Sequence, residues 1–206
     1  MSEKTKKEGF FTTRNLVTCA MLGACSTILM LVEFPLPFIA PPFYELDFSE
    51  VPALIGGFAM GPIAGVIIEL IKILLNLVIN GTDTAGVGEA ANFILGAIFV
   101  TVASLIYKRK KTKKNAFLSL SVGGLAMSLT ATVINAFVMI PFYSKFLSIP
   151  MDVIIGMGQS IFPIVDNLFM FCLLCVLPFN LIKSILVVAV TMLIYKPMSK
   201  VIKGKC

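Results

Sequence analysis

The sequence predicts an all-α membrane protein, a single bundle of six transmembrane helices over residues 1–206. Hydrophobic residues make up 58% of the chain, charged residues only 14%, and the mean hydropathy is +0.97. A composition this apolar is typical of polytopic membrane proteins and excludes an ordinary soluble domain. The length allows about six spans of roughly 20 residues together with their loops.

The distribution of positive charge predicts the topology. Positive charge near the ends of spans marks the cytoplasmic side, so both termini and the loop 108–115 are expected to be cytoplasmic, in a cell membrane. We expect these clusters to contact lipid headgroups rather than nucleic acid. The clusters are Lys4, Lys6, Lys7 and Arg14; Lys108, Arg109, Lys110, Lys111, Lys113 and Lys114; and Lys196, Lys200, Lys203 and Lys205.

The first predicted helix spans residues 15–32 and ends at a proline-rich, acidic stretch, residues 33–49. Proline fixes φ and removes a backbone donor, so a helix that reaches Glu33 cannot continue through this stretch. Irregular backbone is tolerated in a membrane protein only at the surface or where it lines a cavity. We therefore predict that residues 33–49 form an outer lid over a binding site.

The next predicted helices follow from the requirement that residues 14 and 108 lie on the same side of the membrane. An even number of crossings must connect them, so the apolar stretch after the lid has to be divided. Gly61-Pro62 predicts the turn, which gives helices over 50–60 and 62–79. A helix over 90–107 then returns the chain to the basic loop.

The second half is predicted to contain helices over 116–140 and 178–196. A third crossing over 153–177 would place the C-terminal lysines outside. We expect that segment to be an outer loop with a helix packed at the surface, although it could also belong to the last helix.

A few polar side chains stand out within the apolar spans. Asn180 and Lys183 are three residues apart and share a helix face, and Asn135 on the preceding helix could join them. Burying such groups is costly unless they are paired, which makes them candidate ligand contacts. Amide groups suit a heterocycle that alternates C=O and N–H groups. The alternative is hydrogen bonding between helices, with Lys183 extending toward the membrane surface.

Two further groups of polar residues could have a structural role instead of a ligand-binding one. Glu69, Lys72 and Asn76 share one face of the 62–79 helix, and the favoured interpretation is that Glu69 and Lys72 neutralise each other. Glu89 and Asn92 open the 90–107 helix on the outer side, where they either cap the helix or line the pocket.

Catalytic and metal-binding functions are not indicated. The chain has no histidine and no paired nucleophile and base, so we expect no catalytic or metal site. It also has no G-x-x-x-x-G-K-[ST] loop, so any ATP-driven activity must come from a partner. Ala20 and Ala24 form a small-residue patch on the first helix, which allows close packing within the bundle or against another subunit.

Three longer segments carry a family resemblance: LVEFPLPF, ELDFSEVPALIGGFAMGPIAGVIIELIK and VLPFNLIKS. With the Ala20 and Ala24 patch, they resemble the substrate-binding S components of energy-coupling factor (ECF) vitamin transporters, most closely the riboflavin-specific members, over essentially the whole chain. The resemblance implies six helices with cytoplasmic termini. It also implies that the first helix docks through Ala20 and Ala24 on a transmembrane coupling subunit, which two ATP-binding subunits drive.

The resemblance also implies a site. Riboflavin would be the transported ligand, with no cofactor, and the expected contacts are Leu46, Asp47, Phe48, Glu89, Asn92, Asn135, Phe179, Asn180 and Lys183. The asparagines and the lysine would meet the carbonyl and imide edge of the isoalloxazine ring, and Phe48, Phe137 and Phe179 would cover its faces. Asp47 or Glu89 would accept from the ribityl hydroxyls. The alternatives are an S component for another vitamin or a flavin nucleotide, or a membrane-embedded enzyme.

Overall fold

The computed structural model describes residues 12–146 and 148–203, and helices dominate this part of the chain. Lys4, Lys6, Lys7 and Lys205 of the predicted cytoplasmic clusters lie outside it. The first half contains α1 (Thr13–Met30), β1 (Phe34–Pro35), β2 (Glu45–Leu46), α2 (Glu50–Met60), α3 (Pro62–Asn80) and α4 (Val87–Arg109). The second contains α5 (Lys113–Ile134), η1 (Asn135–Met139), α6 (Ile140–Phe146), α7 (Met151–Gln159), α8 (Leu168–Phe171), η2 (Cys172–Val176) and α9 (Leu177–Lys203).

Four helical segments of the described chain are long and apolar enough to cross a membrane: Pro62–Asn80, Val87–Arg109, Lys113–Phe146 and Leu168–Met198. The shorter α2 is apolar but has only 11 residues. The chain is thus an all-α, multi-pass membrane protein.

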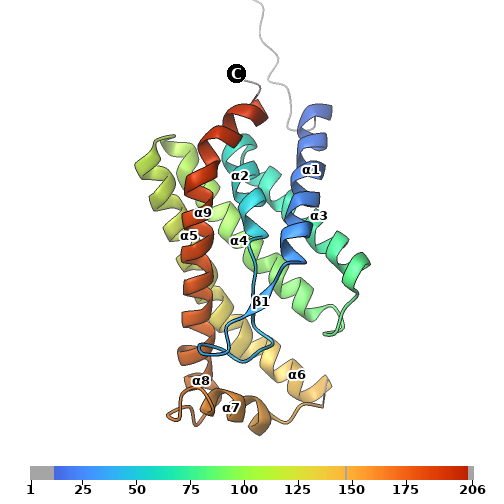
Figure 1. Cartoon of the computed structure of the whole chain (residues 1–206), viewed down its shortest axis with the longest axis vertical. Helices are drawn as coiled ribbons and strands as arrows, with labels where there is room; N and C mark the ends of the chain where they lie inside the picture. The colour runs from blue at the N-terminus through green and yellow to red at the C-terminus, as the bar shows by residue number, and fades with distance from the viewer. Residues whose placement is uncertain (1–11, 147, 204–206) are drawn as a thin grey trace, which may run out of the picture.

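The helix ends are sorted to two sides of the molecule. The start of α1, the connection between α4 and α5 and the end of α9 lie at one end, and α7 and α8 lie at the other (Figure 1). The last part of α4, which carries Lys108 and Arg109, and the last part of α9, which carries Lys196, therefore belong to the same end. The lid stretch, with its two short antiparallel strands, lies toward the opposite end, below α1 and α2.

The reversal between α2 and α3 occurs at Gly61 and Pro62. Gly61 has φ 109°, which a residue with a side chain rarely adopts, and Pro62 is the first residue of α3, where its missing N–H leaves no helix bond unmade. These local preferences let two apolar helices meet without a loop. As a result α2 packs on both α3 and α4.

Several predicted helix boundaries are wrong. The helix predicted to end at 140 continues to Phe146, and the helix predicted to start at 178 is already helical from Leu168. Of the expected outer segment 153–177, only the part up to residue 167, with α7, is separate from the last helix. The helix predicted to begin at 90 begins at Val87.

A π-helical turn explains how two long helices continue through Pro141 and Pro178. A proline ring clashes with the carbonyl four residues earlier, which is that of Phe137 for Pro141 and of Leu174 for Pro178. Phe137 lies in η1 and Leu174 lies in η2. The wider π turn, with its i to i+5 hydrogen bonds, moves that carbonyl away from the ring and lets the helix continue.

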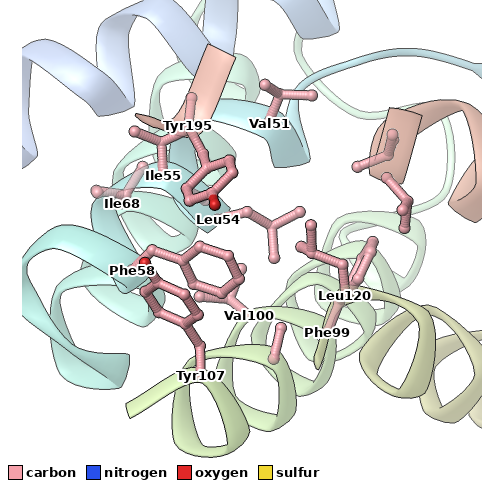
Figure 2. Close-up of a cluster of buried hydrophobic side chains, with 14 of the residues drawn as sticks. Val51, Leu54, Ile55, Phe58, Ile68, Phe99, Val100, Tyr107, Leu120 and Tyr195 are labelled. Carbon is pink, nitrogen blue, oxygen red and sulfur yellow. The ribbon is translucent and has the colours of Figure 1, made fainter. Parts of the chain in front are cut away.

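The buried side chains form two clusters. One cluster contains side chains from each of α1, α2, α3, α4, α5 and α9. In it the rings of Phe58 and Tyr107 stack with their centroids 4.1 Å apart, and the ring of Tyr195 meets both edge-on (Figure 2). The second, the lid cluster, packs lid residues Ala40 and Leu46 against α7, η2 and the start of α9. The lid is therefore anchored by a hydrophobic cluster separate from the first cluster.

Candidate functional site

A cavity of about 620 Å³ lies beneath the lid. Its walls come from the lid, the end of α3, the start of α4, the η1 and α6 region, α7 and the start of α9. The volume is within the range of small-molecule sites, roughly 300–1,000 Å³. Segments that are distant in the sequence thus enclose one candidate binding site.

Seven of the nine predicted site residues line the cavity: Asp47, Glu89, Asn92, Asn135, Phe179, Asn180 and Lys183. Leu46 and Phe48 do not, because side chains alternate along extended backbone. Glu45 and Asp47 face the cavity, whereas Leu46 is fully buried in the lid cluster and Phe48 packs against both clusters. Phe137, expected to cover a ring face, is 78% exposed and points away.

Asn135 and Asn180 each make the same type of local hydrogen bond, from the side-chain amide to the carbonyl four residues earlier. The side-chain Nδ2 of Asn135 donates to the carbonyl of Ala131, and that of Asn180 donates to the carbonyl of Val176, each at 2.9 Å. Oδ1 of Asn180 has no hydrogen-bond partner among the described residues. The amide oxygen at this wall of the cavity is thus available to a donor on a ligand.

Tyr44 fastens the lid across the cavity. Its hydroxyl donates to Oδ1 of Asn135 over 2.6 Å, and its ring lies 5.6 Å from that of Phe179. The sequence analysis did not include Tyr44 in the site. The signal that could have found it is a side chain that is both aromatic and hydrogen-bonding within a lid of otherwise mostly apolar residues and prolines.

Lys183 is ion-paired as well as facing the cavity. Its Nζ lies 2.8 Å from Oδ2 of Asp47 and 3.7 Å from Oε1 of Glu50. Burial alone would raise the pKa of the Asp47 carboxyl, but the ammonium groups of Lys183 and Lys72 hold the pKa below its ordinary value. Asp47, expected to accept from ligand hydroxyls, already accepts from Lys183 and from the Ser49 N–H.

The same ionic network continues away from the cavity. Lys72 Nζ lies 2.6 Å from Oε2 of Glu69 and 3.7 Å from Oε1 of Glu50. The interpretation that Glu69 and Lys72 neutralise each other is therefore confirmed, while Asn76, one turn further along α3, lines the cavity. We call Asp47, Glu50, Glu69, Lys72 and Lys183 the buried charge cluster.

One wall of the cavity, formed by the lid and the start of α4, is acidic. Partial burial and the neighbouring carboxyl of Glu45 raise the pKa of Glu33 to about 7. Asp83 and Glu89 line the same cavity, and Glu89 Oε2 accepts from the Thr84 hydroxyl at 3.0 Å. Glu89 therefore both lines the pocket and supports the start of α4.

Sequence comparison assigns the family. The model of the ECF transporter substrate-specific component matches residues 14–195. The chain belongs to this family. Similar proteins include the riboflavin transporter RibU of Staphylococcus aureus (strain TCH60), 35% identical over 92% of this chain and 93% of the relative. The riboflavin transporter FmnP of Bacillus subtilis (strain 168) is 34% identical over 88% of this chain and 90% of its own.

The fold agrees with that assignment. A solved structure described as the S component of a bacterial ECF transporter superposes with a TM-score of 0.70 at 34% identity, covering 92% of this chain and 98% of its own. The relatives of this S component are membrane transport components and not enzymes. The family has no cofactor, so a bound small molecule would be cargo.

Proposed function

We propose that this S component binds riboflavin at the outer face of the cell membrane and delivers it inward. A transmembrane coupling subunit and two ATP-binding subunits would provide the energy. The observation that carries the proposal is the meeting of Asn135, Asn180 and Lys183 on one cavity wall beneath a lid. The names of the relatives, riboflavin transporters RibU and FmnP, support the choice of ligand.

The chemistry of the cavity suits the two halves of the vitamin. The Asn180 amide oxygen would accept from the imide N–H of the isoalloxazine ring, and Lys183 would donate to a ring carbonyl. Phe179 and Tyr44 would cover the ring faces. At the acidic wall, Glu89 and Asn92 would hydrogen-bond with the ribityl hydroxyls. Riboflavin is uncharged, so a lysine already neutralised by Asp47 is compatible with it.

The proposed membrane arrangement has six crossings with both termini in the cytoplasm. The grouping of Lys108, Arg109 and Lys196 at one end of the molecule supports this orientation. Ala20 and Ala24 are exposed on α1, whereas Gly23 between them packs on Ile71 of α3. The alanine face is therefore free to dock on the coupling subunit.

A fluorescence titration of purified protein tests the ligand. Riboflavin fluorescence should be quenched at a stoichiometry of one, and N180A and K183A should each weaken binding by at least tenfold. L193A is the matched control on α9, because Leu193 is 78% exposed and does not line the cavity. Wild-type protein that leaves riboflavin fluorescence unchanged would contradict the ligand assignment. Riboflavin binding unaffected by either variant would show that Asn180 and Lys183 do not form the binding site.

The docking step has a separate test. Replacing Ala20 and Ala24 together by leucine should leave riboflavin binding unchanged and abolish uptake by cells that supply the other subunits. Retained uptake would rule out this face as the docking surface.

A further inference from the structure

Glu50 occupies an unusual position in the buried charge cluster. Its Oε1 lies 3.7 Å from Nζ of Lys72 and 3.7 Å from Nζ of Lys183, so one carboxylate stands between two ammonium groups. Glu50 is 2% exposed and does not line the cavity. Its second oxygen, Oε2, has no hydrogen-bond partner among the described residues. The buried carboxylate therefore has one oxygen, Oε2, that could accept a further hydrogen bond.

The two carboxylates near Lys183 belong to different parts of the fold. Asp47 lies in the lid, directly after β2, whereas Glu50 is the first residue of α2. If the lid opens to admit a ligand, Asp47 would move with it. A buried ammonium group that loses its counter-ion is strongly destabilised. Opening would therefore be opposed unless another acid compensates for Lys183.

Lys72 does not depend on Glu50. It is held at 2.6 Å by Glu69 and donates to the Ser49 hydroxyl at 3.2 Å. Glu50 can therefore turn toward Lys183 without leaving Lys72 uncompensated. The unpartnered Oε2 provides the acceptor for the new contact.

We propose that Glu50 is a positioning residue. It becomes the counter-ion of Lys183 when the lid opens and Asp47 moves away with it. This inference rests on the proposed function, since it assumes that the lid opens to admit riboflavin. Glu50 lowers the cost of the open state and keeps the Lys183 ammonium at the cavity wall. Asp47, in contrast, stabilises the closed state.

Stopped-flow riboflavin binding to E50Q tests the inference. Glutamine keeps the size of the side chain and removes the charge, so the open state alone should be destabilised. The association and dissociation rates should both fall by about tenfold, and Kd should change by less than about threefold. D47N should act in the opposite sense and raise the dissociation rate.

A matched control separates this role from general damage. E69Q removes an equally buried carboxylate that contacts Lys72 but not Lys183, so it should lower Tm and leave both rates within about twofold of the wild type. A purely structural role for Glu50 would raise the dissociation rate and Kd together. That result, or unchanged rates in E50Q, would overturn the inference.

Two further measurements keep the test independent of folding and of the ligand. If E50Q does not fold, E50D retains the charge with a shorter reach, and both rates should fall by about threefold; wild-type rates in E50D would count against the role. Hydrogen–deuterium exchange of the β1 and β2 amides without riboflavin should slow in E50Q and accelerate in D47N. Unchanged exchange would refute the counter-ion role even if the protein binds a different ligand.

Discussion

The hydroxyl of Tyr44 donates to the side-chain oxygen of Asn135 over 2.6 Å, although 91 residues separate them in the chain. Tyr44 belongs to the lid, and Asn135 is the first residue of the π turn that follows α5. The bond ties the lid wall of the cavity to its helical wall. It also occupies a position from which Asn135 would contact a ligand.

Y44F should loosen the closed lid. Phenylalanine keeps the ring contact with Phe179 and removes the hydrogen bond, which is worth about 1 kcal/mol. The riboflavin dissociation rate should therefore rise by roughly fivefold. Stopped-flow fluorescence measures this rate. Y143F is the control, since Tyr143 also lines the cavity and its hydroxyl has no hydrogen-bond partner among the described residues. An equal effect in both variants would show that the Tyr44–Asn135 hydrogen bond does not hold the lid closed.

P178A should weaken riboflavin binding without lowering stability. Alanine removes the clash with the carbonyl of Leu174, so η2 can revert to a regular helix. A change of register by one residue turns the following side chains by about 100°, and Asn180 would no longer face the cavity. We expect Kd to rise by at least tenfold in a titration, with Tm unchanged or higher.

P197A is the control for that change, because Pro197 lies inside α9 far from the cavity and the carbonyl four residues before it is in regular helix. Its riboflavin affinity should equal that of the wild type. Wild-type affinity in P178A as well would mean that the π turn does not set the position of Asn180.

The lid should be sensitive to pH near neutrality through Glu33. Because burial and the Glu45 carboxyl raise its pKa from 4.5 to about 7, the closed state binds a proton that the reference state has released. This stabilisation is complete below about pH 4.5 and is lost as the pH rises through about 7. Asp47 and Lys183 also face Glu33, and the lowered pKa of Asp47 keeps it charged throughout this range.

Riboflavin affinity should therefore decline between about pH 4.5 and pH 7 and level off above that range, and E33Q should flatten the profile. The change should be only a few-fold, since Glu33 remains solvent-exposed and water screens its interactions. E45Q should move the transition to lower pH by removing the neighbouring charge. A decline that persists in E33Q would locate the titrating group elsewhere.

Phosphorylated flavins should bind more weakly than riboflavin. Among the described residues, five carboxylates line the cavity, those of Glu33, Glu45, Asp47, Asp83 and Glu89, and the one lysine that lines it, Lys183, is already paired. The phosphate of FMN carries about −1.5 to −2 charges at neutral pH. We expect a Kd at least tenfold higher for FMN by fluorescence titration.

The difference between the two flavins should shrink at high salt, because ions screen exposed charges. The variant D83N should narrow the difference further, with little effect on riboflavin affinity. Equal affinities for the two flavins at low salt would show that the phosphate lies outside the acidic wall.

Local features of the chain were enough to predict much of the architecture. The apolar composition determines a membrane bundle, and the lid prolines and Gly61-Pro62 mark where helices must stop or reverse, because each acts through its own backbone geometry. The predicted helix limits at residues 140 and 178 fall beside Pro141 and at Pro178, but both prolines lie inside continuous helices. A proline inside a helix can be accommodated by a π turn when surrounding contacts hold the helix together.

For the candidate site too, the sequence predicted one part and the tertiary structure decided the rest. Polarity within apolar spans was sufficient to single out Asn135, Asn180 and Lys183, since a buried polar group must have a reason. Only the tertiary structure decided that Lys183 meets Asp47, 136 residues away, and that Leu46 turns into the core. Sequence determines which groups need partners, whereas the partner depends on how distant segments pack and share one small buried space.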